Sequence, residues 1–167
     1  MKKVIVIGCP GAGKSTFARR LRDATGLPLH YLDMLYHKPD KTTLSREEFD
    51  RRLDEIMADD SWIIDGNYRR TMERRLERCE TAIFLDFPTD VCLSGAEERI
   101  GMMREDLPWT ASMDDRFRQK IVSFSESQRA DICGLLERYR AGREILIFHS
   151  RAEADAYLDT LAACSGI

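Results

Sequence analysis

Hydrophobic and polar positions follow two alternating patterns along the chain. Short apolar runs recur at residues 4–7, 62–65, 82–85 and 144–148, with a weaker one at 28–32, and the β-branched run 4–7 is typical of a strand buried on both faces of a sheet. Between them, apolar residues recur at steps of three and four, which is the period of a helix with one buried face. Strands that alternate with helices predict an α/β fold with a parallel sheet and right-handed crossovers.

Two of the predicted helices begin with a recognisable start signal. Ser45 with Glu48, and Ser150 with Glu153, have the spacing of a capping box, in which the serine accepts a hydrogen bond from the first helical turn. The predicted helical spans are 14–24, 45–57, 72–79, 90–103, 114–140 and 150–161. In parallel sheets ligands bind at the carboxyl ends of the strands. We therefore expect the functional residues directly after each apolar run.

The segment after the first apolar run has the pattern of a phosphate-binding loop. It reads Gly8-Cys9-Pro10-Gly11-Ala12-Gly13-Lys14-Ser15-Thr16, which matches G-x-x-x-x-G-K-S between a strand and a helix. In such a loop backbone N–H groups surround a phosphate, the lysine reaches the β- and γ-phosphates, and the serine hydroxyl ligates Mg²⁺. The sequence thus predicts that ATP and Mg²⁺ bind at Gly8, Gly11, Ala12, Gly13, Lys14, Ser15 and Thr16.

A carboxylate that helps Ser15 to hold Mg²⁺ is expected at the end of another strand. Asp65 ends the run 62–65, as a Walker B aspartate does, and would hold Mg²⁺ together with Ser15. Asp86, after the run 82–85, is the alternative. Asp33 follows the second run and is a candidate for binding a substrate hydroxyl or the metal, although a capping role in a turn explains it equally well.

Two other nucleotide-binding classes fit the sequence poorly. The run Leu93-Ser94-Gly95-Ala96-Glu97 resembles the signature loop of transporter ATPases, but it follows both candidate Walker B strands, whereas the transporter signature precedes that strand. We therefore interpret it as part of a helix. The guanine motif N-K-x-D of GTPases is missing from the sequence.

Composition narrows the class further. A length of 167 residues suits a single domain, and 43% hydrophobic with 33% charged residues is typical of a globular protein. The net charge of −3 disfavours tight, sequence-independent DNA binding, because Lys and Arg side chains drive that binding. The five cysteines form no C-x-x-C pair, and no apolar run is long enough to span a membrane. We expect a cytoplasmic protein with reduced thiols that does not bind membranes.

Three of these segments together resemble a known family. The loop 8–16, Asp33-Met34-Leu35 and Asp65-Gly66 resemble adenylate kinase and its nucleoside-monophosphate kinase relatives. The runs 61–68 and 83–88 are similar to a bacterial subgroup, the DNA topology modulation or FlaR-like proteins. The resemblance implies a three-layer P-loop NTPase fold in one domain, residues 1–167. It further implies a five-stranded parallel sheet of order 2-3-1-4-5 with helices on both faces, an acceptor-side helical region at about 33–60 and a short helical lid at about 99–116.

The resemblance also implies roles for individual side chains, with one departure. Adenylate kinases carry an arginine that grips the AMP phosphate where this chain has Tyr36, so AMP fits poorly as the acceptor. Arg69 matches a second family arginine in position, and Arg70 is its alternative. The implied catalytic residues are Lys14, Asp65, Arg69, Arg99 and Arg104, and the implied acceptor-binding residues are Asp33, Tyr36, Arg69 and Arg70.

Two functions are compatible with these residues. One is an ATP-dependent phosphotransferase that acts on a small acceptor, which the sequence does not identify. The other is a nucleotide-dependent regulatory protein with weak ATPase activity, as the name of the FlaR-like subgroup suggests. The two functions differ in what stimulates ATP hydrolysis. Stimulation by a small acceptor would support the phosphotransferase, and stimulation by DNA would support the regulatory protein. The oligomeric state is not readable from the sequence.

Overall fold

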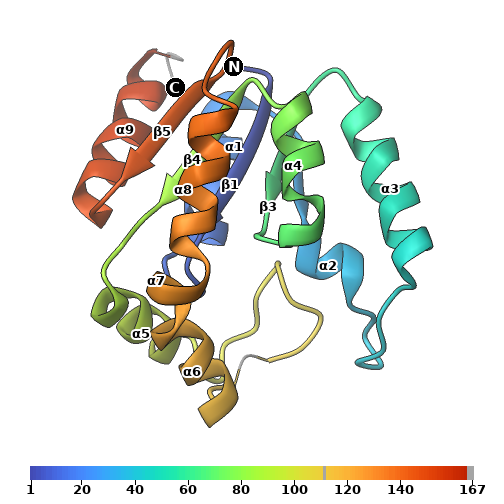
Figure 1. Cartoon of the computed structure of the whole chain (residues 1–167). Helices are drawn as coiled ribbons and strands as arrows, with labels where there is room; N and C mark the ends of the chain where they lie inside the picture. Colours follow the sequence, from blue (N-terminus) through green and yellow to red (C-terminus); the bar gives the residue numbers. More distant parts are fainter. Residues whose placement is uncertain (111, 165–167) are drawn as a thin grey trace.

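A parallel five-stranded sheet forms the centre of the computed structural model, which describes residues 1–110 and 112–164 (Figure 1). The strand order is β2-β3-β1-β4-β5, which confirms the predicted topology. The strands are β1 (Lys3–Gly8), β2 (Leu29–Tyr31), β3 (Trp62–Asp65), β4 (Thr81–Leu85) and β5 (Glu144–Phe148). Every residue of β3 and β4 is buried, as is β1 after its first residue. This burial explains why these strands appear in the sequence as continuous apolar runs.

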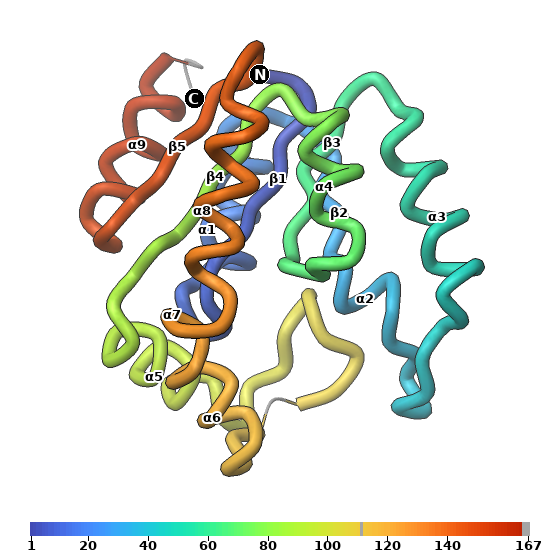
Figure 2. Tube along the Cα trace, in the orientation of Figure 1, coloured from blue at the N-terminus to red at the C-terminus, as the bar shows by residue number. Residues whose placement is uncertain are grey.

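Helices cover both faces of the sheet, as Figures 1 and 2 show. The helices α1 (Lys14–Thr25) and α9 (Arg151–Cys164) pack against each other on one face. On the other face lie α3 (Arg46–Ala58), α4 (Arg69–Arg78) and α8 (Arg129–Arg138). The three-layer architecture is therefore confirmed, and it leaves the carboxyl edge of the sheet open for a site.

The predicted serine caps are both present, and the Ser150–Glu153 capping box is complete, whereas the Glu48 carboxylate pairs with Arg51 and Arg52. The Ser45 hydroxyl accepts a hydrogen bond from the backbone N–H of Glu48 at 3.1 Å and begins α3. The Ser150 hydroxyl accepts one from the N–H of Glu153 at 3.2 Å, and the Glu153 carboxylate accepts one from the N–H of His149 at 2.7 Å. These side chains satisfy N–H groups that a helix start leaves without partners.

Two predicted spans differ from the structure. The expected strand 28–32 ends at Tyr31, and a short helix α2 (Leu32–Tyr36) begins there. The expected helix 114–140 is divided into α6 (Asp115–Val122), α7 (Phe124–Ser127) and α8. The hydroxyls of Ser123 and Ser127 donate to carbonyls four residues earlier, a local hydrogen bond that competes with regular helix geometry. Apolar periodicity alone does not reveal such interruptions.

The lid is irregular where a helix was expected. Helix α5 (Thr89–Glu97) ends six residues before the predicted boundary at 103, and residues 98–110 and 112–114 form turns, bends and irregular segments. Gly101 has a φ of 77°, in the left-handed region that favours glycine, and Pro108 follows in the same segment. Figure 2 shows this lid segment passing below the carboxyl edge of the sheet.

Helix α5 packs directly against the phosphate-binding loop. A Cβ atom added to Gly95 would lie 2.3 Å from the carbonyl oxygen of Gly11, and one added to Gly11 would lie 1.9 Å from the carbonyl oxygen of Cys92. Two backbones can approach this closely only without side chains between them. The run that resembles a transporter signature is therefore helical, as interpreted from the sequence, and Gly95 serves this close contact.

The contact can be tested with two glycine substitutions. We expect Gly95→Ala to lower the free energy of unfolding by about 1–3 kcal/mol, because the added methyl group must displace the backbone of the loop. Gly134→Ala in α8 is the matched control, since its Cβ would meet nothing within 4 Å. The free energy of unfolding of this control should rise by about 0.5–1 kcal/mol, because alanine has a higher helix propensity than glycine. Urea denaturation measures both changes, and equal stabilisation by the two substitutions would contradict the close packing.

Candidate active site

The phosphate-binding loop has the backbone geometry that its sequence predicts. Gly11 and Gly13 have φ values of 84° and 93°, and Gly13 caps the amino end of α1. The Lys14 ammonium donates to the carbonyl oxygens of Gly8 and Cys9, both at 3.0 Å. The loop thus joins a cation to the amino end of a helix, which is an arrangement that attracts a phosphate.

Asn67 fixes the loop from the neighbouring strand, a role that the sequence analysis missed. Its side-chain oxygen accepts from the N–H of Gly8 at 3.0 Å, and its side-chain nitrogen donates to the carbonyl oxygen of Gly8 at 2.8 Å. Both backbone groups of Gly8 are therefore paired with one amide. The only sequence signal was the position of Asn67 two residues after the end of β3.

Arg75 holds the segment that carries Asn67. This side chain of α4 is fully buried and donates to the carbonyl oxygens of Gly66 at 2.8 Å, Tyr68 at 3.2 Å and Asn67. Burial lowers its pKa to about 10. These bonds fix residues 66–68 without occupying the cavity beside them.

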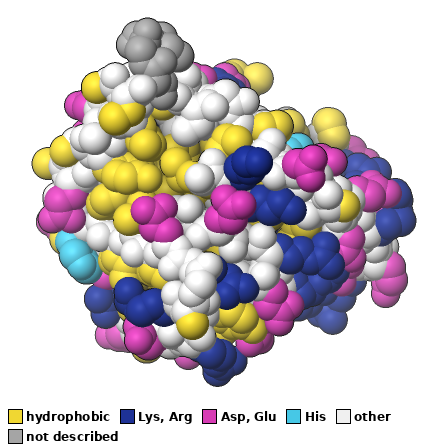
Figure 3. Space-filling model, turned by 90° about the horizontal axis from the view of Figure 1, so that it is seen from above, with side chains coloured by type: hydrophobic (Ala, Val, Ile, Leu, Met, Phe, Trp, Pro, Cys, Tyr) yellow, Lys and Arg dark blue, Asp and Glu magenta, His cyan; other side chains and the backbone are white. Residues whose placement is uncertain are grey.

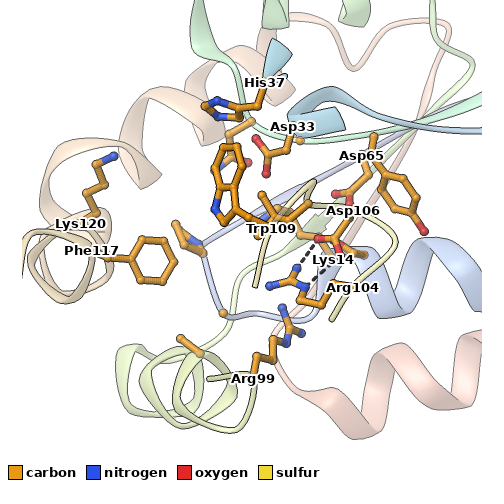
Figure 4. A pocket seen from close by; sticks show the side chains of 18 of the residues that line it. Lys14, Asp33, His37, Asp65, Arg99, Arg104, Asp106, Trp109, Phe117 and Lys120 are labelled. Atoms are coloured by element: carbon orange, nitrogen blue, oxygen red, sulfur yellow. Dashed lines mark hydrogen bonds and ion pairs between the residues drawn. The ribbon is translucent and has the colours of Figure 1, made fainter. Parts of the chain in front are cut away.

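A cavity of about 450 Å³ lies at the carboxyl edge of the sheet (Figure 4). The loop, the ends of β2 and β3, the lid and α6 all contribute to its walls. The polar and aromatic side chains that line it include Lys14, Ser15, Asp33, His37, Asp65, Asn67, Tyr68, Arg99, Arg104, Asp106 and Trp109. The chain thus brings together most of the predicted catalytic and acceptor-side groups.

The two candidate metal-side aspartates have different surroundings. Asp65 lines the cavity, is 5% exposed, and its Oδ1 has no hydrogen-bond partner among the described residues. Burial raises the pKa of Asp65 to about 6, against the opposing effect of the Lys14 charge. Asp86 accepts two hydrogen bonds from Arg129, both 2.7 Å long, and lies 3.4 Å from His149. Asp65 is therefore available to a ligand, whereas Asp86 is held in an ion pair.

The cavity suits a metal that arrives with a nucleotide. Among the described residues, no group of three or more His, Cys, Asp and Glu side chains is placed to hold a metal ion. Mg²⁺ is commonly held by one or two carboxylates together with phosphate oxygens. The unpartnered oxygen of Asp65 and the Ser15 hydroxyl fit that need.

The acceptor side of the cavity is acidic and aromatic. The Tyr68 hydroxyl donates to Asp33 at 2.7 Å, and the Tyr68 backbone has a φ of 32°, which is strained for a residue with a side chain. Tyr36 does not line the cavity but packs edge-on against the Tyr68 ring, at 5.6 Å between centroids. His37 and Trp109 meet edge to face at 5.0 Å, so the lid contacts the acceptor side.

The predicted arginines divide into two groups. Arg99 and Arg104 line the cavity, and Arg104 pairs inside it with Asp106. Burial and the nearby Arg104 lower the pKa of Arg99, and no carboxylate in the described part of the chain forms an ion pair with it. Arg69 and Arg70 are exposed and outside the cavity, where they pair with Asp131 and Asp50 respectively. The structure thus brings the lid arginines, but not Arg69 or Arg70, to the site.

A second cavity of about 310 Å³ lies on the other side of the loop. Arg99 lines both cavities and forms part of the wall between them. The second cavity is formed by α1, α9 and the end of β4, and its lining includes Ala12, Gly13, Thr16, Arg20, Leu85 and Arg151. The predicted phosphate-binding residues therefore lie between two spaces rather than in one.

Comparisons with known proteins agree with this architecture. No family model matches the chain. Adenylate kinase from Thermotoga petrophila is 31% identical over 88 residues, which is 52% of this chain and 39% of that protein. The adenylate kinase of Thermotoga neapolitana is 30% identical over the same shares. The chain thus matches well under half the length of these relatives.

Solved structures match over nearly the whole chain. Shikimate kinase from Acinetobacter baumannii, in complex with shikimate, has a TM-score of 0.62 at 16% identity, over 98% of this chain and 92% of that one. Shikimate kinase from Bacteroides thetaiotaomicron has a TM-score of 0.57 at 17% identity, over 98% of both chains. The chain has the P-loop kinase fold of these enzymes. None of its described helices is long and apolar enough to cross a membrane.

The contrast between Asp65 and Asp86 gives a pH prediction. Because the pKa of Asp65 rises from 3.8 to about 6 on folding, the folded protein binds more protons between these values. Its stability then falls as pH rises through that window, by about 3 kcal/mol in total. In EDTA without nucleotide, we expect Asp65→Asn to be more stable than wild type at pH 8 by up to this amount, with the gain vanishing near pH 4.

Asp86→Asn is the matched substitution with the opposite expectation. It weakens two charge-assisted bonds from Arg129, so we expect a loss of about 1–3 kcal/mol at pH 8. Urea denaturation at several pH values measures both variants. A destabilised Asp65→Asn at pH 8 would show that the Asp65 carboxylate is a structural group.

Proposed function

We propose that the protein is an ATP-dependent kinase that transfers the γ-phosphoryl group to a small hydroxylated acceptor. The observation that carries the proposal is the placement of the phosphate-binding loop between two cavities that share Arg99. Such an arrangement offers separate places for a nucleoside and an acceptor, with the phosphates between them.

The nucleotide would extend across the loop. Its nucleoside end fits the cavity between α1 and α9, and its phosphates pass the N–H groups at the start of α1. Lys14, Arg99 and Arg104 supply positive charge where the β- and γ-phosphates would lie. A bound Mg²⁺ would add charge neutralisation, and Ser15 and Asp65 are the side chains proposed to hold it.

The chain's own groups can support phosphoryl transfer without a covalent intermediate, because that reaction depends on positioning and charge neutralisation. Asp33 lies on the acceptor side, where its carboxylate can orient an acceptor hydroxyl and accept its proton while Tyr68 holds the carboxylate in place. The lid places Trp109 against His37 and thus covers the acceptor side. Exclusion of water there limits the competing hydrolysis of ATP.

The acceptor side supports an acceptor that has no phosphate group. Arg69 and Arg70, which would serve as phosphate anchors in a nucleoside-monophosphate kinase, are held by Asp131 and Asp50 outside the cavity. At the position of the adenylate kinase arginine, Tyr36 packs among aromatic rings. Asp33 would repel a phosphate that approached from this side.

Charge pairing disfavours the regulatory alternative that acts on DNA. The basic side chains on the side of α3 and α4 lie among acidic ones (Figure 3). Arg70 and Arg74 of α4 pair with carboxylates of α3, as do Arg51 and Arg52 within α3. Arginines neutralised in this way are poorly available to the phosphates of DNA.

Replacement of Lys14 tests nucleotide binding. We expect Lys14→Ala to weaken Mg–ATP binding or turnover by about 100-fold or more, because the β- and γ-phosphate charge loses its nearest cation. Calorimetric titration with ATP measures the affinity. Lys2→Ala, at an exposed position before β1, is the control and should bind as wild type does. Unchanged ATP binding by Lys14→Ala would contradict the assignment of the loop.

An ATP-consumption screen tests the acceptor. We expect consumption to rise with one class of small hydroxylated compounds and not with nucleoside monophosphates or duplex DNA. A nucleoside monophosphate as the best acceptor would refute the acceptor assignment and leave the kinase proposal intact. Stimulation by DNA alone would instead favour the regulatory function.

A further inference from the structure

The lid reaches into the phosphate-binding loop through one carboxylate. The Ser15 hydroxyl donates to Oδ2 of Asp106 at 2.8 Å, a contact between residues 91 positions apart. Asp106 is 3% exposed, and Arg104 pairs with both of its oxygens, donating to Oδ1 at 2.9 Å and also to Oδ2. Asp106 belongs to no sequence motif, and it has no role in the proposed function.

The Asp106 carboxylate lies where the phosphates of a bound nucleotide would repel it. Ser15 is the loop residue proposed to hold the metal beside the β- and γ-phosphates, so a nucleotide would bring phosphate charge next to Asp106. Arg104 pairs with Asp106, but its single positive charge offsets only part of the summed negative charge of the carboxylate and the phosphates. A divalent cation between carboxylate and phosphates would turn the repulsion into attraction.

The spacing of the oxygens suits such a cation. Adjacent ligands of an octahedral Mg²⁺, each about 2.0–2.1 Å from the ion, are about 2.9 Å apart. The Ser15 hydroxyl oxygen and Asp106 Oδ2 are 2.8 Å apart. The hydrogen bond that now joins these two oxygens holds them at a separation that a cation could take over without moving the lid.

Asp65 provides a second acceptor for the Ser15 proton. Asp65 lines the same cavity as Ser15, and its Oδ1 is buried and without a hydrogen-bond partner in the described chain. Figure 4 shows Asp65 and Asp106 close to each other in the cavity. If the Ser15 hydroxyl turns toward Asp65, the Ser15 lone pairs become available, and Asp106 Oδ2 is released when Arg104, which lines the same cavity, turns from this carboxylate to the phosphates.

We propose that Asp106 is a divalent-cation ligand that the lid contributes, and that with Ser15 it binds the Mg²⁺ of Mg–ATP. The proposal rests on the proposed nucleotide binding. The cation then joins the lid to the loop, so metal binding and lid closure form one event. Without the cation, a bound nucleotide displaces Asp106 and leaves the lid open.

The test compares nucleotide binding with and without the metal. A non-hydrolysable ATP analogue is titrated in EDTA and in Mg²⁺, by calorimetry and by tryptophan fluorescence. Trp109 reports the lid because it contacts His37, while Trp62 is fully buried in β3 and gives a constant background. For wild type we expect tighter binding and a fluorescence change in Mg²⁺.

Three variants separate metal binding from lid anchoring. In EDTA, we expect Asp106→Asn to bind the ATP analogue as tightly as wild type does, or more tightly. The ratio of its affinity in Mg²⁺ to its affinity in EDTA should be lower than that of wild type by about tenfold or more, because the amide is a poor Mg²⁺ ligand. Asp106→Glu keeps a carboxylate and should retain most of the gain. Glu105→Gln makes the same charge change on the neighbouring lid residue, whose side chain is 61% exposed, and should behave as wild type does.

Two results would overturn the proposal. A full Mg²⁺ gain in Asp106→Asn would show that Asp106 only anchors the lid, and an equal loss of affinity in EDTA and in Mg²⁺ would show that it only shapes the loop. Failure of the proposed function looks different, since wild type would then bind the analogue in neither condition.

Discussion

The close packing of backbone around the phosphate-binding loop is the constraint on which the rest of the site depends. Gly11 has no room for a side chain beside the Cys92 carbonyl, and the Asn67 amide pairs with both backbone groups of Gly8. The loop is thus fixed from α5 on one side and from the end of β3 on the other. This rigidity keeps N–H groups in place for an anion and costs no reorganisation when the ligand arrives.

The site holds charges whose burial is unfavourable without a ligand. Burial raises the pKa of Asp65, and burial together with Arg104 lowers the pKa of Arg99. Both shifts mean that the surroundings oppose the charged form of the group. Such groups are common in binding sites, because a bound phosphate and its cation supply the missing partners. The distribution of unpaired charge therefore supports the same location for the site as the loop motif does.

The sequence predicted the parts of the fold that depend on local patterns. The buried strands are continuous apolar runs, the capping boxes are four-residue signals, and the loop motif follows directly from β1. The roles of Arg69 and Arg70 depend on Asp131 and Asp50, which are distant in the sequence. No periodicity could show that these partners hold them outside the cavity. Asp106 lies in an irregular segment with neither motif nor period, so only its contact with Ser15 reveals it.

The lid connects the two sides of the proposed reaction through two neighbouring contacts. Asp106 contacts the loop at Ser15, and Trp109, three residues later, contacts His37 on the acceptor side. A segment this short cannot move one contact far without moving the other. In the proposed reaction, events at the nucleotide phosphates would therefore be transmitted to the acceptor side by the same few residues. A kinase would benefit from this coupling, because its lid would then close over the acceptor only when the nucleotide and its cation are both in place.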